Sequence, residues 1–142
     1  MKVIKVFLVV SMAFLLFSSA VAAGDFDWID NLNIQAEADQ SGFRARLATR
    51  FNLGDAQIKV VLGNVEKPAD AYMVFRLGEM SNQPTERVIE KYKSGHGKGW
   101  GVLAKSLGIK PGSKEFHALK QGHDLFDKKP HGKSKGKRIG KK

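Results

Sequence analysis

The sequence predicts an all-α protein: a compact bundle of about five or six short helices, followed by a disordered basic C-terminal tail. Between residues 41 and 126, apolar side chains recur at helical spacing, which indicates amphipathic helices. Glycine, proline and asparagine interrupt this pattern at short intervals, as expected for brief helices joined by turns. Hydrophobic residues make up 42% of the 142 residues, enough for one core. We therefore expect one folded domain over residues 24–127.

The start of this domain is open to two interpretations. Residues 32–39 alternate strictly between apolar and polar side chains, a pattern typical of a half-buried strand. Their glutamine, alanine and glutamate are helix formers, however, and Trp28, Leu32 and Ala36 would share one face of a helix. The sequence therefore leaves this segment either extended or helical.

Polar caps and glycines delimit the next two helices. Ser41 is the expected N-cap of a helix with one apolar residue per turn, and Gly54 is expected to end it. Asp55 is the expected N-cap of a second helix over residues 56–62. A glycine and an asparagine follow, so this second helix should be short.

The most apolar segment should form the central helix of the bundle. It begins at Pro68, because proline suits the first helical position, and runs to about Met80. Pro84 starts the following helix, which Gly95 closes.

Two further short helices complete the predicted bundle. Residues 100–107 form the first, which Gly108 stops, and Ile109 fits the apolar position just after a glycine cap. Ser113 is the expected N-cap of the last helix, whose apolar face includes Phe116.

Residues 1–23 have the pattern of a secretory signal peptide. Lys2 and Lys5 precede an apolar run, and small residues follow it up to Ala22 and Ala23, where we expect cleavage. The apolar run is shorter than the roughly 20 residues that span a membrane, so no transmembrane segment is expected in the mature chain. The protein is therefore expected to be exported to the periplasm or the extracellular space.

Charge is concentrated at the C-terminus. The net charge of the whole chain is +10, yet residues 24–127 contain equal numbers of basic and acidic side chains. Residues 128–142 contain no acidic residue and almost nothing to bury, so we expect them to be disordered. The cations of this tail are Lys128, Lys129, Lys133, Lys135, Lys137, Arg138, Lys141 and Lys142.

The tail predicts contact with an anionic polymer or a membrane surface. A cluster of cations attracts any polyanion through counterion release, without selecting among phospholipid headgroups, lipopolysaccharide, anionic glycans and nucleic acid. The tail has no aromatic residue for base stacking and no apolar face, so neither specific nucleic-acid recognition nor membrane insertion is expected. The leading hypothesis is an exported, non-enzymatic helical protein whose tail contacts anionic envelope material. A purely solubilising tail is the alternative.

The segment from Ser94 to Gly101, at the start of the helix over residues 100–107, contains four glycines and a lysine. Its backbone N–H groups could form a nest for an anion. A Walker-type phosphate loop is not indicated, because a helix precedes the loop and a glycine follows the lysine. The other interpretation is a tight connection in which the glycines let the tryptophan pack against backbone. The candidate loop site consists of Gly95, His96, Gly97, Lys98, Gly99 and Trp100.

Catalytic chemistry receives little support from the residue types. Cysteine is absent, which excludes disulfides, thiolate nucleophiles and cysteine-ligated metals. Ser113 and His117 are four residues apart, but no third orienting group or oxyanion site is evident. His117 and His123 lack a metal-binding spacing. We therefore predict no catalytic residue, no metal and no cofactor.

Two other functions remain consistent with the sequence. A ligand-binding or enzymatic domain could use the Gly95–Gly101 loop together with the helix over residues 113–123. One cleft lined by His96, Lys98, Trp100, His117 and His123 would favour it, and their dispersal would weaken it. A helix-turn-helix DNA binder is suggested by residues 92–116, although a Lys-Pro-Gly sequence lengthens the turn and export would separate the protein from the chromosome.

Two segments carry a resemblance to other proteins. The stretch from Gly97 to Lys120, with the pattern G-K-G-W-G…L-G-I-K-P-G-S…F-H-x-L-K, and the stretch from Pro68 to Met80 resemble uncharacterised small exported bacterial proteins. The resemblance implies the same layout: a signal peptide, a helical body and a basic tail. It implies no activity, ligand or catalytic residue.

Overall fold

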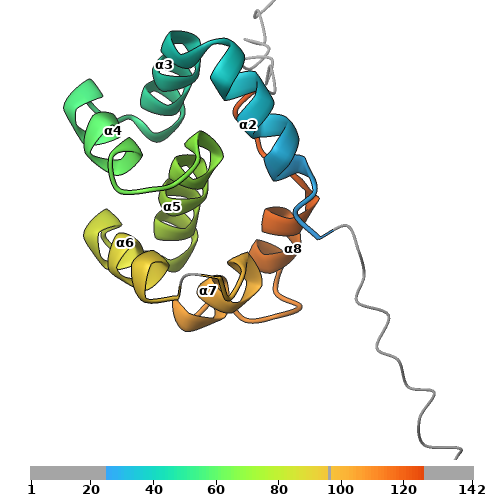
Figure 1. The fold of residues 1–142 in the computed structure, drawn as a ribbon. Helices are drawn as coiled ribbons and strands as arrows, with labels where there is room; N and C mark the ends of the chain where they lie inside the picture. The colour runs from blue at the N-terminus through green and yellow to red at the C-terminus, as the bar shows by residue number, and fades with distance from the viewer. Residues whose placement is uncertain (1–24, 96, 127–142) are drawn as a thin grey trace, which may run out of the picture.

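The computed structural model describes residues 25–95 and 97–126, which form seven α-helices and contain no strand (Figure 1). The all-α prediction is confirmed, with seven helices in place of the expected five or six. The expected signal peptide (residues 1–23), the expected tail (residues 128–142) and His96 lie outside the described residues. The helices are α2 (Trp28–Ala38), α3 (Gln40–Phe51), α4 (Asp55–Leu62), α5 (Pro68–Ser81), α6 (Thr85–Ser94), α7 (Trp100–Ser106) and α8 (Lys114–Gln121).

The segment that was open to two interpretations is helical. Within α2, Ile29, Leu32 and Ala36 are buried, a spacing of three and four residues that forms one helical face. A strand would have placed Ile34 on the same side as Leu32, but 65% of Ile34 is exposed. The packing of α2 against α5 therefore decides between the two patterns.

The caps of α3 differ from those expected. Asp39, and not Ser41, caps its N-terminus: the Oδ1 atom accepts a hydrogen bond from the backbone N–H of Gly42, at 2.8 Å. A Cβ at Gly42 would lie 2.0 Å from Asp39 Oδ2, so the cap requires glycine at that position. At the other end, Asn52 closes the helix in the left-handed conformation, two residues before Gly54.

Helix α4 begins one residue earlier than expected. Gly54 is its N-cap, and Asp55 is its first helical residue. The Gln57 side chain accepts a hydrogen bond from the backbone N–H of Gly54, which satisfies one donor of the helix start. The carboxylate of Asp55 instead forms an ion pair with Lys59, at 2.8 Å, one turn along the helix.

Helix α5 is the centre of the bundle, as predicted. Eight of its fourteen residues are buried. Helices α2, α4 and α6 pack directly against it, and in Figure 1 the other six helices surround it. It begins at Pro68, as the sequence predicted, and it ends at Ser81.

The predicted glycine stop after α7 and the predicted serine N-cap of α8 are confirmed. After α7, Gly108 has a φ of 89°, and the N–H of the buried Ile109 donates to the carbonyl of Ala104. Before α8, the Oγ atom of Ser113 accepts a hydrogen bond from the N–H of Phe116, at 3.2 Å.

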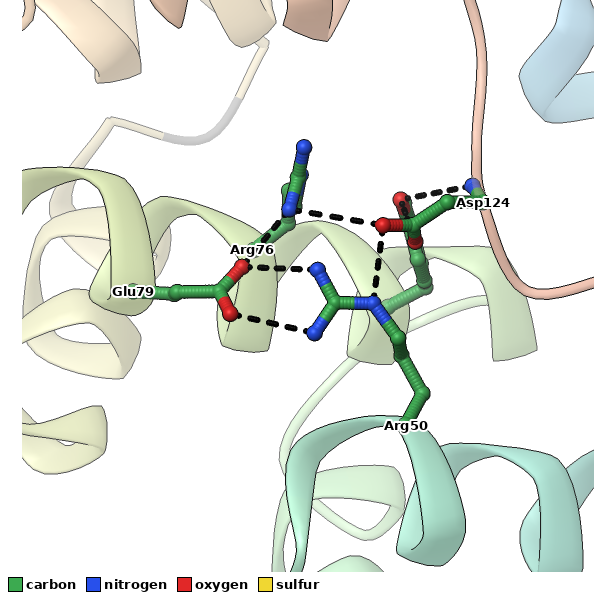
Figure 2. A network of polar contacts seen from close by, with 5 residues as sticks. Arg50, Arg76, Glu79 and Asp124 are labelled. Atoms are coloured by element: carbon green, nitrogen blue, oxygen red, sulfur yellow. Dashed lines mark hydrogen bonds and ion pairs between the residues drawn. The ribbon is translucent and has the colours of Figure 1, made fainter. Parts of the chain in front are cut away.

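A network of charged side chains attaches the segment after α8 to α3 and α5 (Figure 2). The guanidinium of Arg50 lies between two carboxylates: it donates to both oxygens of Glu79, at 3.0 and 2.9 Å, and to Asp124 Oδ2, at 2.8 Å. Arg76 also donates to Glu79, at 2.7 Å, and the hydroxyl of Tyr72 donates to the other oxygen of Asp124. Two arginines are thus matched by two carboxylates, so this network has a structural role.

The two ends of the described chain lie beside each other. Lys120 on α8 forms an ion pair with Asp25, at 2.6 Å. The ring of His123 lies 5.5 Å from the ring of Trp28, at the start of α2. The first and last parts of the domain are therefore held together across one side of the bundle.

Candidate functional site

A cavity of about 450 Å³ lies where α2, the start of α5, the end of α6 and the glycine-rich loop meet. Asp30 and Asn33 line it from α2, and Glu66 and Asp70 line it from the approach and first turn of α5. Trp100 lines it from the loop side. Its volume is in the range of small-molecule binding sites.

A hydrogen-bonded cluster forms the polar part of the cavity wall. Oδ2 of Asp70, in the first turn of α5, accepts from the hydroxyl of Tyr92 at 2.7 Å and from the backbone N–H of Lys67 at 3.2 Å. The same hydroxyl accepts a hydrogen bond from the N–H of Glu66, at 3.2 Å. The start of α5 is thereby attached to α6, and the wall is held in place by bonds within the fold.

Asn33 has one polar side-chain atom without a partner. Its Oδ1 atom accepts a hydrogen bond from the N–H of Ala69, at 2.8 Å, and so satisfies a donor at the start of α5. Only 6% of Asn33 is exposed, and its Nδ2 atom is buried with no hydrogen-bond acceptor. A buried donor without an acceptor costs about 1–3 kcal/mol. Asn33 lines the cavity, but Nδ2 itself is covered by the fold, so the unpartnered donor is a local cost of the packing.

Aromatic rings form the other part of the wall. Trp100 stacks on Tyr92, with ring centroids 5.6 Å apart and ring planes 25° apart. Phe26 lines the cavity from the segment before α2. These rings supply flat, polarisable surface beside the polar cluster.

Burial shifts the pKa values of two groups in the polar cluster, Asp70 and Tyr92. Burial raises the pKa of Asp70 above its ordinary value, and hydrogen bonds from Tyr92 and the Lys67 N–H only partly oppose it. Burial also raises the pKa of Tyr92, to about 12. The hydroxyl of Tyr92 therefore stays protonated at neutral pH and remains a donor to Asp70.

Part of the predicted loop site lines this cavity. Gly95, Gly97, Gly99 and Trp100 are among the lining residues. Lys98 is not: it lines a smaller neighbouring recess of about 180 Å³, beside α7. His96 and all the predicted cations of the tail lie outside the described residues.

The structure does not bring the other candidate residues to this cavity. His117 is exposed on α8, and His123 packs against the rings of Trp28, Tyr72 and Phe126. At this cavity the loop meets α2 and α5, and neither His117 nor His123 lines it. These histidines are therefore not gathered with Trp100 in one cleft, which weakens the ligand-binding alternative in the form that the sequence suggested.

The helix-turn-helix alternative also lacks its usual geometry. Residues 107–113 separate α7 from α8, whereas the turn of this motif has three or four residues. Within the described part of the chain, no three His, Asp or Glu side chains are arranged to hold a metal ion. In the same residues, no helix combines the length and apolarity needed to cross a membrane.

Several residues of the cavity were not expected from the sequence. Asn33, Asp70 and Tyr92 are the main ones. The one available signal was Asp70 itself, because an acidic residue in the first turn of a helix after Pro68 is typical of a capping pattern. That pattern predicts a helix start, and it gives no indication of a cavity.

The chain was compared with known proteins by sequence and by structure. No protein-family model matches it, and no curated protein or solved structure matches it. The interpretation of the cavity therefore depends on the residues that line it.

Proposed function

We propose that the protein is an exported, non-enzymatic binding protein whose helical domain holds a small molecule in the cavity at the start of α5. One observation carries this proposal: a cavity of about 450 Å³ combines the polar side chains of Asn33 and Asp70, held in place by hydrogen bonds, with the stacked rings of Tyr92 and Trp100. Ligand sites typically combine apolar walls with a few polar groups held in fixed positions.

The residue types favour binding over catalysis. Among the described lining residues there is no Ser, Thr or Cys nucleophile and no His, and the carboxyl side chains of Asp30 and Glu66 belong to residues exposed to solvent. Asp70 accepts two hydrogen bonds from within the fold, which hold the first turn of α5. Its carboxylate therefore supports the wall of the cavity.

The basic tail supports a second activity, attachment to anionic envelope material. The charge distribution favours it: residues 24–127 are formally neutral, whereas residues 128–142 carry eight cations and no acid. Within the domain, Arg50, Arg76 and Arg87 are engaged in ion pairs. The pattern of residues 1–23 supports export, which would bring the tail to the envelope.

Ligand binding can be tested by NMR with small-molecule fractions from the envelope of the source cells. A ligand in the cavity should shift the side-chain amide signal of Asn33 and the backbone signals of Gly97 and Gly99, which line it. The backbone signal of Gly63, which caps the far end of α4, should stay unchanged.

Trp100→Ala provides a variant test, with circular dichroism to show that it remains folded. It should weaken binding of any active fraction, because it removes one wall of the cavity. If no fraction shifts the Asn33, Gly97 and Gly99 signals, the proposed function is wrong.

A further inference from the structure

We propose that a recess between α6 and α7 binds a phosphate group, either as free phosphate or as the headgroup of a phospholipid. This inference goes beyond the proposed function, because the recess is distinct from the cavity at the start of α5 and belongs to the helical domain, not to the tail. Two observations carry it: an uncompensated run of lysines in the sequence, and the way the fold gathers two of them around one recess.

The helical domain is neutral only as a whole. Residues 24–90 contain eleven acidic and seven basic side chains, whereas residues 91–114 contain six lysines and no acidic residue. The second of these segments, which covers the end of α6, the glycine-rich loop, α7 and the turn before α8, is therefore strongly basic. Its cations are Lys91, Lys93, Lys98, Lys105, Lys110 and Lys114.

These lysines have no carboxylate partner in the part of the chain that the structure describes. None of the six takes part in an ion pair there, and only Lys93 makes a side-chain hydrogen bond, to the neutral Asn64, at 2.6 Å. The carboxylates at the two ends of the run are placed elsewhere: Glu90 pairs with Arg87, at 3.0 Å, and Glu115 lines another recess. The positive charge of the run is therefore available to an anion from outside the fold.

The fold gathers two of the lysines around a recess of about 180 Å³ between the neighbouring helices α6 and α7 (Figure 1). Lys91 lines it from α6 and Lys98 lines it from the loop, and no acidic side chain is among its described lining residues. An anion in the recess would be attracted by both ammonium groups. The volume is below that of a typical small-molecule site, so it suits one compact group.

Hydrogen bonds hold the loop where it returns Lys98 toward α6. The N–H of Lys98 donates to the carbonyl of Gly95, at 3.0 Å, and the N–H of Gly95 donates to the carbonyl of Lys91, at 2.9 Å. A Cβ at Gly95 would lie 3.0 Å from that carbonyl, so this close return of the chain favours glycine. The backbones of the two lysines are thus connected through Gly95.

The groups that line the recess suit a phosphate. A phosphate monoester carries a charge of about −1.5 to −2 and several strong acceptor oxygens, which match two lysine ammonium groups. The hydroxyls of Ser94 and Ser106 donate to backbone carbonyls of their own helices, at 3.2 and 2.7 Å, so the lysines supply the donors. Val102 also lines the recess and is 52% exposed, which leaves apolar surface for the glycerol or acyl part of a phospholipid.

Matched probes can test the phosphate site directly. Inorganic phosphate is the free form, and dihexanoyl phosphatidic acid, kept below its micelle concentration, is the lipid form. Dihexanoyl phosphatidylcholine is the control, with the same acyl chains and a zwitterionic headgroup. Each is titrated into the purified full chain at constant ionic strength, which removes the effect of screening alone. NMR follows the backbone amides of Ser94, Val102 and Ser106, which line this recess and not the larger cavity.

Inorganic phosphate and phosphatidic acid should both shift these three signals and saturate. Phosphatidylcholine should bind at least about tenfold more weakly than phosphatidic acid, because its headgroup has no net charge. The side-chain amide signal of Asn33, in the larger cavity, should stay unchanged. Phosphatidic acid that binds at least about tenfold more tightly than inorganic phosphate would identify a lipid as the source, and equal affinities would identify free phosphate.

Charge-neutralising variants provide the second test. Lys91→Gln and Lys98→Gln, made together, should weaken binding of inorganic phosphate by at least about tenfold. Lys105→Gln and Lys110→Gln, made together, are the matched control, because they remove the same charge from the same segment and neither residue lines the recess. The control should change the affinity by less than about threefold, since salt screens the more distant charges.

Three outcomes would overturn the proposal. If the Ser94, Val102 and Ser106 signals do not shift, or shift without saturating, the recess is not a phosphate site. If the two double variants weaken binding equally, the run of lysines acts as a diffuse positive surface. If phosphatidylcholine binds as tightly as phosphatidic acid, the site recognises acyl chains and not phosphate. None of these outcomes affects the proposed function, which is tested through the signals of the larger cavity.

Discussion

Asn33 is buried between α2 and the start of α5, and its side chain supplies the acceptor for the N–H of Ala69. We expect Asn33→Ala to lower the free energy of unfolding by about 1 kcal/mol, because this buried N–H would lose its partner while removal of the unpartnered Nδ2 offsets part of the cost. Asn31→Ala, at an exposed position of the same helix, should change it by less than about 0.5 kcal/mol. Urea unfolding followed by circular dichroism measures both. Equal effects of the two variants would contradict the assigned hydrogen bond.

Trp100 is partly exposed beside the cavity and contacts Tyr92 through its ring face. Trp100→Ala should therefore lower the free energy of unfolding by about 1–3 kcal/mol, less than the 3–5 kcal/mol of a fully buried aromatic residue. Leu47→Ala is the buried reference, because Leu47 is fully buried in α3, and it should cost about 2–5 kcal/mol. Denaturant unfolding gives both values. A larger loss for Trp100→Ala than for Leu47→Ala would place the ring in the core.

At the scale of the element, the segment after α8 is attached by carboxylates whose pKa values are lowered. Hydrogen bonds from Arg50 lower the pKa of Glu79. Burial alone would raise the pKa of Asp124, but hydrogen bonds from Arg50 and Tyr72 and the charge of Arg76 outweigh it, and the net shift is downward. A carboxyl with a lowered pKa in the folded state stabilises the fold above its unfolded pKa. That stability is lost as the pH falls through the folded pKa.

We therefore expect the domain to lose stability below about pH 4, where these carboxylates become protonated. The double variant Glu79→Gln and Asp124→Asn should be less stable than wild type at neutral pH and should lose less on acidification. Glu90→Gln removes a carboxylate from an exposed pair with Arg87 and should keep the wild-type slope. Urea midpoints measured from neutral pH to pH 3 test this. An unchanged acid slope in the double variant would show that the network does not control acid unfolding.

Asp70 has the opposite effect on the pH dependence of stability. Its pKa is raised by burial, so its ionisation weakens the fold, and its contribution to stability is largest at low pH and falls as the pH rises through the folded pKa. Acidification thus relieves a cost at the start of α5 while it removes stability from the segment after α8. The two effects arise at different places in the fold, Asp70 at the start of α5 and Glu79 near its end, and the variants of Glu79 and Asp124 separate them.

Most helices follow from the sequence, because caps and periodicity are local. Proline placed the starts of α5 and α6, and glycine placed the ends of α6 and α7, to within one or two residues. The left-handed cap at Asn52 was missed, since asparagine takes this conformation less often than glycine. Residues 32–39 could not be decided from their pattern, because burial against α5 selects the helix and this contact is not visible in the local sequence.

At the scale of the whole molecule, the cavity could not be predicted. The hydrogen bonds that build it join Asn33 to Ala69 and Asp70 to Tyr92, pairs separated by 36 and 22 residues. Each of these residues has an ordinary local interpretation, as part of a helical face or a cap. Only the packing of α2 and α6 on the two sides of α5 brings them together. The glycine-rich loop was the one local sign of the site, and its glycines line one side of the cavity.

The whole molecule combines a formally neutral domain with a tail that carries eight cations, so folding and attachment to anions should be separable. Among the residues that the structure describes, the core runs from Ile29 to Leu125. The sequence of residues 128–142 contains a single aliphatic side chain besides proline. Deleting residues 128–142 should therefore leave helical content and melting temperature nearly unchanged. The deletion should also remove most of the affinity for heparin and for vesicles of anionic phospholipid.

The salt dependence of this affinity tests whether the tail binds anions through counterion release. In the full chain, binding to heparin should fall steeply between low and physiological salt, because each neutralised anion releases condensed counterions. Replacing the lysines of the tail by glutamine is the matched control, since it keeps the length of the chain and removes most of the charge. This variant should bind as weakly as the deletion. Binding that survives the deletion and does not respond to salt would place the anion site in the neutral domain, and the proposed role of the tail would be wrong.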